Sequence, residues 1–89
     1  KENPLIAPST VTITNCPTST IDISDTVDLG VVILPLSAQQ TGTWSSSAPL
    51  IATVNSSTGL VTGVDVGAAV ITFTTTNGEK TATCTINVV

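Results

Sequence analysis

Three consecutive stretches decide the fold of this chain: Trp44-Ser-Ser-Ser-Ala-Pro-Leu-Ile-Ala-Thr-Val54, Gly59-Leu-Val-Thr-Gly-Val64 and Gly67-Ala-Ala-Val-Ile-Thr72. Apolar residues recur at alternate positions in these stretches, which is the period of a strand with one buried face. Glycines and small polar residues, which favour turns, separate one stretch from the next. The sequence therefore predicts short strands over residues 52–54 and 60–64, then a long strand with Ala69, Ile71 and Phe73 on one face.

The N-terminal half continues this alternation. Residues 11–14 predict a half-buried strand, which Pro17 ends because proline cannot donate to a strand ladder. The sequence then predicts a strand through Ile21 and Ile23, a kink near Asp25, and a single further strand through residues 27–33 up to Pro35.

The C-terminal end predicts a hairpin. Asn77 and Gly78 both tolerate the positive φ of a two-residue type I′ turn. The strand after it would present Ala82, Cys84, Ile86 and Val88 inward. About seven short strands predict an all-β antiparallel sandwich. Its expected core residues are Trp44, Ala52, Val54, Val61, Ile71, Phe73 and Ile86.

Length and charge restrict the possible functions. With 89 residues the chain makes one small domain, expected over residues 10–89, with residues 1–9 as an extended leading segment that carries Pro4 and Pro8. Two lysines, no arginine and a net charge of -4 cannot neutralise a row of phosphates, so nucleic acid is not an expected partner. No apolar run approaches the roughly 20 residues of a membrane span, so no membrane insertion is expected.

The sequence predicts no catalytic site and no cofactor. It has no His, and no Ser or Thr has a base beside it in a recognisable motif. Two Cys fall short of a zinc site. We also expect no concave binding pocket, because a small sandwich filled by Val, Ile and one Trp would spread its polar groups over convex faces.

Three carboxylates are weak candidates for calcium. Asp22, Asp25 and Asp28 recur at three-residue spacing around the expected kink. Strand geometry separates Asp22 and Asp28 by about 20 Å, too far for one ion unless the kink brings them together. Solvated carboxylates that discourage edge pairing are the favoured interpretation.

From about Val11 to Val89 the chain resembles the group 2 bacterial immunoglobulin-like domain, Big2, through the three stretches quoted above. The resemblance implies an immunoglobulin-like β-sandwich from bacterial surface proteins, secreted enzymes or phage virions. It carries over Trp44, Gly59, Gly63, Gly67 and Ile71 as structural positions, and none as a catalytic one. The chain departs from the pattern at Ser24, where the family usually has Gly.

Two cysteines allow one intramolecular pair, Cys16 with Cys84, or two unpaired thiols. The chain around both positions resembles a Big2 subgroup with a Cys at each of them. This resemblance implies a disulfide that ties the start of the sandwich to its end, in an oxidising compartment.

The expected function is that of a non-catalytic spacer or interaction module, monomeric in isolation, in an exported multidomain bacterial protein of the cell surface or extracellular space, with a role in adhesion. Its expected partners are neighbouring domains and a surface protein or glycan. One alternative is a virion domain on a phage tail or capsid that aids host attachment. Another is a glycan-binding module attached to a secreted enzyme, although both aromatic side chains are expected in the core.

Overall fold

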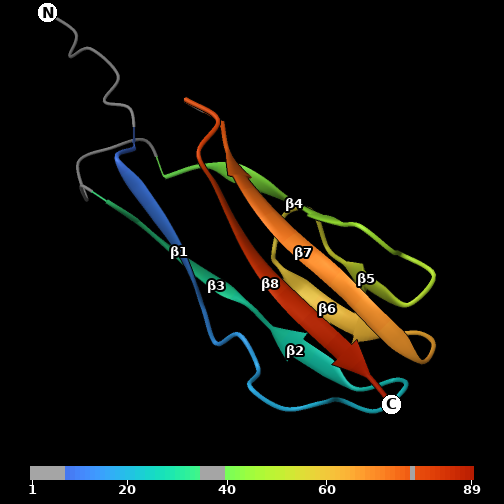
Figure 1. Ribbon diagram of the computed structural model, residues 1–89. Coiled ribbons are helices and arrows are strands. Elements are labelled where there is room, and N and C mark those ends of the chain that lie inside the picture. The colour runs from blue at the N-terminus through green and yellow to red at the C-terminus, as the bar shows by residue number, and fades with distance from the viewer. Residues whose placement is uncertain (1–7, 35–39, 77) are drawn as a thin grey trace, which may run out of the picture.

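The computed structural model describes residues 8–34, 40–76 and 78–89, and these residues form eight strands and no helix (Figure 1). The predicted all-β class is confirmed. The strands are β1 (Thr10–Thr14), β2 (Thr26–Asp28), β3 (Gly30–Leu34), β4 (Gly42–Ser46), β5 (Ala52–Val54), β6 (Leu60–Gly63), β7 (Gly67–Thr75) and β8 (Thr81–Val88).

The strands build two layers of antiparallel pairs. One layer contains β1 paired with β3, and β2 paired with β6, which also pairs with β5. The other layer has the order β4-β7-β8. Only Leu29 separates β2 from β3, so these two strands together correspond to one strand of an immunoglobulin sandwich. Counted in this way, four strands pack on three, which is the constant-type immunoglobulin arrangement. The predicted sandwich of about seven strands is confirmed in this sense.

The single strand predicted over residues 27–33 is instead two strands that change partner at Leu29. Before Leu29 the chain pairs with β6, and after it the chain pairs with β1. The alternation was correct, because Leu29 and Ile33 are buried and Val27 and Val31 are half-buried. Periodicity reports only which face is buried, and it carries no information on which neighbour the backbone pairs with.

The strand predicted through Ile21 and Ile23 is wrong. Ile21 makes one isolated parallel bridge to Val88, and Ile23 is exposed. Ser24 has a φ of 76°, a left-handed conformation that a strand cannot contain. Ser24 lies inside a tight turn, which the Asp25 N–H closes by donating to the Asp22 carbonyl over 3.0 Å.

The predicted two-residue turn between the last strands is also wrong. The hairpin closes where the Thr75 N–H donates to the Lys80 carbonyl, which leaves a four-residue loop from Thr76 to Glu79. Gly78 and Glu79 carry the positive φ values, 81° and 51°. Asn77 lies outside the described residues.

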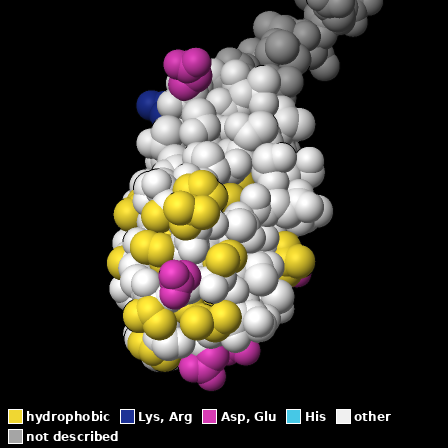
Figure 2. Space-filling view, turned by 90° about the vertical axis from the view of Figure 1, so that its right-hand side faces the viewer, with side chains coloured by type: hydrophobic (Ala, Val, Ile, Leu, Met, Phe, Trp, Pro, Cys, Tyr) yellow, Lys and Arg dark blue, Asp and Glu magenta, His cyan; other side chains and the backbone are white. Residues whose placement is uncertain are grey.

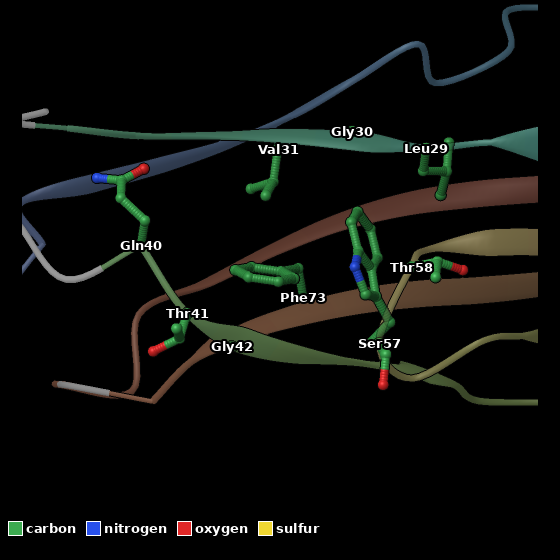
Figure 3. Close-up of a pocket in the computed structure, with 10 residues that line it drawn as sticks. Leu29, Gly30, Val31, Gln40, Thr41, Gly42, Ser57, Thr58 and Phe73 are labelled. Atoms are coloured by element: carbon green, nitrogen blue, oxygen red, sulfur yellow. The ribbon is translucent and has the colours of Figure 1, made fainter.

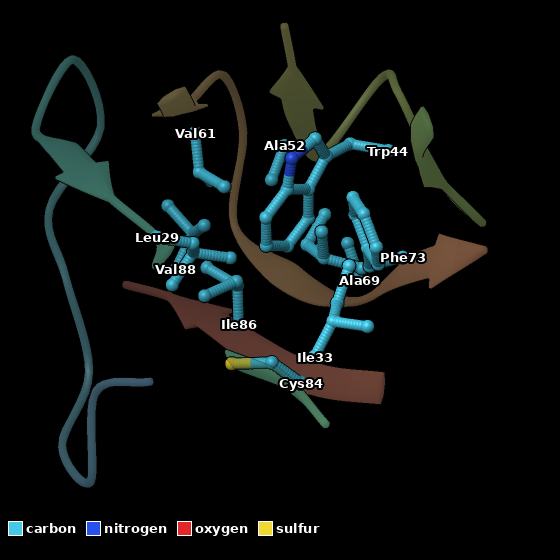
Figure 4. Close-up of a cluster of buried hydrophobic side chains, with 11 residues drawn as sticks. Leu29, Ile33, Trp44, Ala52, Val61, Ala69, Phe73, Cys84, Ile86 and Val88 are labelled. Atoms are coloured by element: carbon cyan, nitrogen blue, oxygen red, sulfur yellow. The ribbon is translucent and has the colours of Figure 1, made fainter. Parts of the chain in front are cut away.

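The core lies between the two layers (Figure 4). Among the residues expected there, Trp44, Ala52, Val61, Ile71, Phe73 and Ile86 are buried, and Val54 is half-buried and packs against them. Leu29, Ile33, Ala69, Cys84 and Val88 complete the buried cluster.

A disulfide joins Cys16 to Cys84, with a Cα–Cα distance of 6.0 Å and a sequence separation of 68 residues. The predicted pairing is therefore confirmed. Cys16 follows β1 directly, and Cys84 lies in β8. The bridge ties the first strand of the sandwich to the last.

The chain enters and leaves the sandwich at opposite ends of its long axis. In Figure 1 the start of β1 lies at the upper end, whereas β8 runs down to the C-terminus at the lower end.

Candidate functional site

A pocket of about 300 Å³ opens between β3, β4 and the turn that precedes β6 (Figure 3). It exists because the two layers differ in length. β5 and β6 have three and four residues, whereas β7 and β8 have nine and eight, so the first layer leaves part of the inner face of the second uncovered. The lining residues are Leu29, Gly30, Val31, Gln40, Thr41, Gly42, Trp44, Ser57, Thr58 and Phe73.

An aromatic pair contributes the apolar part of this pocket. The Trp44 and Phe73 rings meet edge to face, with centroids 4.9 Å apart and an interplanar angle of 62°. Gly59 allows the turn before β6 to approach Trp44. It has a φ of 81°, and a Cβ there would lie 2.7 Å from Cε2 of Trp44 and 2.8 Å from the Leu29 carbonyl oxygen.

The indole N–H of Trp44 has no hydrogen-bond partner in the described part of the chain. Trp44 is only 5% exposed. Every fully buried side-chain nitrogen or oxygen of the described residues has a partner, so this indole nitrogen is not fully buried. Because Trp44 lines the pocket, its indole N–H is a candidate donor for a ligand bound there.

The edge of β3 that faces away from β1 borders the pocket. The Leu29 N–H donates to the Gly59 carbonyl over 3.1 Å, and the Ile33 carbonyl accepts from Nε2 of Gln40 over 3.2 Å. Backbone groups point to alternate sides along a strand. Val31, midway between these two residues, therefore directs its N–H and carbonyl to this same side, where no described residue bonds them.

The pocket is suited to binding a neutral group. None of its lining residues is charged, and Thr41, Ser57 and Thr58 place hydroxyls around its apolar part. The lining contains no acid, base or thiol that could act on a bound molecule. The arrangement can hold an apolar group and pair with main-chain amides.

The structure does not bring the three calcium candidates together. Asp22 and Asp25 share a turn, in which the Asp22 N–H donates to Oδ2 of Asp25 over 3.0 Å, while Asp28 lies on β2. All three are exposed. Within residues 8–34, 40–76 and 78–89, no group of three His, Cys, Asp or Glu is placed to hold a metal ion.

The pocket is the feature that the sequence interpretation missed. The expectation of convex faces treated both layers as equally long. The signal was present in the spacing of turn residues, which leaves room for only short strands around residues 52–63 and for long ones after Gly67. Nothing in that spacing shows which side chains the uncovered area exposes.

Exposed apolar side chains gather elsewhere, on the lower half of the face in Figure 2. The loops that join β4 to β5 and β6 to β7 contain the most exposed ones, with Leu50 83% and Val66 62% exposed. The two loops are joined by bonds from the Val64 and Asp65 N–H groups to the Ile51 carbonyl. In the described residues no helix is long and apolar enough to cross a membrane.

Known proteins that are similar to this chain include a phage virion protein and a fragment of intimin. An Ig-like virion protein of Serratia phage KSP90 is 38% identical over 72 residues, which cover 80% of this chain and 28% of that protein. A C-terminal 282-residue fragment of intimin, solved in complex with the intimin-binding domain of the translocated intimin receptor, is 27% identical with a TM-score of 0.71. That match covers 88% of this chain and 30% of the fragment. The chain therefore spans less than a third of each relative.

The family model of the bacterial Ig-like domain (group 2) matches residues 8–86. This range includes all of β1 to β7, both cysteines, the aromatic pair and the turn at Gly59. The chain belongs to the bacterial Ig-like domain (group 2) family.

Proposed function

We propose that this domain is a non-catalytic spacer and interaction module of a multidomain protein displayed outside the cell, where it carries mechanical load between its neighbours. The intimin fragment is named as one half of a complex with a receptor, which supports a role in contact between surfaces. The domain itself contributes length and a stable scaffold.

The observation that carries this proposal is the position of the disulfide on the path between the two chain ends. The start of β1 and the C-terminus lie at opposite ends of the long axis (Figure 1), so a pull between neighbouring domains would act along the sandwich. The Cys16–Cys84 bond spans 68 residues, and β2 to β7 all lie within that loop. The covalent bond would therefore keep the chain within the loop from being pulled out, while β1 and the end of β8 stay outside its protection.

The same disulfide supports a location outside the cytoplasm. Disulfides persist in oxidising surroundings such as the bacterial cell surface, the extracellular space and virions. Display on a bacterial surface is the first candidate. A phage virion is the second, favoured by the 38% identity to the Ig-like virion protein.

An antibody raised against the folded domain tests display. We expect gold-labelled antibody to bind intact cells of the source bacterium, without permeabilisation, in electron micrographs. Labelling of phage particles and not of cells would select the virion candidate. Labelling that appears only after permeabilisation would contradict both.

A further inference from the structure

We propose that the pocket beside β3 binds an extended, uncharged peptide segment of a partner protein, which adds a short strand to the free edge of β3 and inserts an apolar side chain towards Trp44 and Phe73. This site goes beyond the spacer role. It does not depend on whether the module is displayed on a cell or on a virion.

The layer that contains β3 and β6 is incomplete. β6 pairs with β2 up to Leu60, and the ladder ends with the bond from the Leu29 N–H to the Gly59 carbonyl. Beyond that point β3 continues to Leu34, and β1 is the only described strand that pairs with it. No described strand therefore occupies the position in line with β6 next to Val31, whose N–H and carbonyl point towards it. An added antiparallel strand would pair with both groups.

An added strand would also place side chains over the pocket. Residues of an added strand alternate between the two faces of the layer, so every second side chain points inward. The inward position next to Val31 leads to Phe73 (Figure 3) and to its ring partner Trp44, which also lines the pocket. Trp44 is 5% and Phe73 3% exposed. An apolar side chain fits there, and a peptide carbonyl could accept from the indole N–H of Trp44.

The uncharged lining of the pocket disfavours charged groups, and its nearly buried rings disfavour sugars. No lining residue is ionised, so an inserted carboxylate or ammonium group would lose hydration without gaining a counter-charge. The aromatic rings are nearly buried, so they form no exposed platform for sugar rings. A neutral main chain with an apolar side chain suits the main-chain groups of Val31 and the aromatic pair.

The test uses the whole chain and a capped pentapeptide with a central leucine between pairs of threonines. Trp44 is the only tryptophan, so its fluorescence and its single indole N–H resonance report the pocket directly. We expect saturable binding with a Kd below about 1 mM. Chemical-shift changes should centre on Val31, Thr58 and the Trp44 indole.

Two matched controls separate the proposed mode from adhesion to the surface. The same peptide with N-methylated amides, or with aspartate in place of leucine, should bind at least about tenfold more weakly. Ser57→Arg places a long cation at the pocket mouth and should weaken binding about tenfold, whereas Ser56→Arg, in the same exposed turn but outside the lining, should leave it unchanged.

Three results would overturn the proposal. One is the absence of saturation up to about 10 mM peptide, or saturation that maps to β1 or β8. Another is a saturable response to methyl glycosides at Trp44 without a response to the peptide, which would assign the pocket to a glycan. The third is a nuclear Overhauser contact between residues 35–39 and the indole in the free protein, which would show that the chain itself fills the site.

Discussion

Ser24 adopts a left-handed backbone conformation, with a φ of 76°, within the turn of residues 22–25 that leads into β2. A side chain with a Cβ is strained there by roughly 1–2 kcal/mol, whereas glycine is not. This accounts for the glycine that the family usually has at this position. The residue is anchored by the bond from its N–H to the Gly63 carbonyl over 2.9 Å, so the conformation is held by the fold.

We expect Ser24→Gly to raise the free energy of unfolding by about 0.5–1 kcal/mol, because relief of strain exceeds the added entropy of the unfolded chain. Urea denaturation followed by Trp44 fluorescence measures it. Ser19→Gly is the matched control, since Ser19 is exposed in the same connection and has no positive φ. An equal change in both variants would contradict the role of the backbone angle.

At the scale of elements, the turn between β5 and β6 holds the aromatic core in place. Asn55 Oδ1 accepts from the Ser57 and Thr58 N–H groups over 2.9 and 3.1 Å, and the Gly59 N–H donates to the Asn55 carbonyl over 2.9 Å. These bonds hold the Gly59 backbone close against the Trp44 ring. The turn thus fixes both the end of β6 and one wall of the pocket.

Gly59→Ala and Gly30→Ala make a matched pair at this scale. At Gly59 a Cβ meets the Leu29 carbonyl and the Trp44 ring at a positive φ, so we expect a loss of about 2–4 kcal/mol. At Gly30 it meets only Oγ1 of exposed Thr14, 2.5 Å away, which can rotate, so we expect a loss below about 1 kcal/mol. Thermal unfolding of the two variants should differ accordingly, and similar midpoints would contradict this explanation.

The same elements show how far sequence reasoning extends. Alternation predicted which residues of β7 and β8 are buried, because one face of each strand packs on the core. It did not predict the change of partner at Leu29, the left-handed Ser24 or the four-residue loop after Thr75. Those features depend on backbone pairing, to which side-chain periodicity is insensitive. The pocket depends on the relative length of two layers, which no single strand encodes.

At the scale of the whole molecule, the disulfide closes a loop with a sequence separation of 68 residues. On the chain-entropy model such a loop contributes about 4 kcal/mol, by restricting the unfolded chain. Sheets of three, three and two strands in an 89-residue domain bury a modest core, so this contribution is a large part of the stability.

We therefore expect reduction of the disulfide to lower the melting temperature by roughly 15–30 °C, from the usual temperature shift per kcal/mol for a domain of this size. Calorimetry with and without reductant measures this shift, and thiol counting on the unfolded, unreduced protein should find no free Cys. Cys16→Ser with Cys84→Ser should reproduce the reduced state. An unchanged midpoint would contradict a stabilising bridge.

The mechanical role of the disulfide is tested most directly by stretching single molecules of this domain between handles on the two ends of the chain. With the disulfide intact, we expect only the residues outside the Cys16–Cys84 loop to extend. After reduction the same pull should release the loop and lengthen the molecule by roughly 220–240 Å, at about 3.3–3.6 Å for each residue of the sequence separation. Equal extension of the oxidised and reduced protein would show that the bridge does not carry the load.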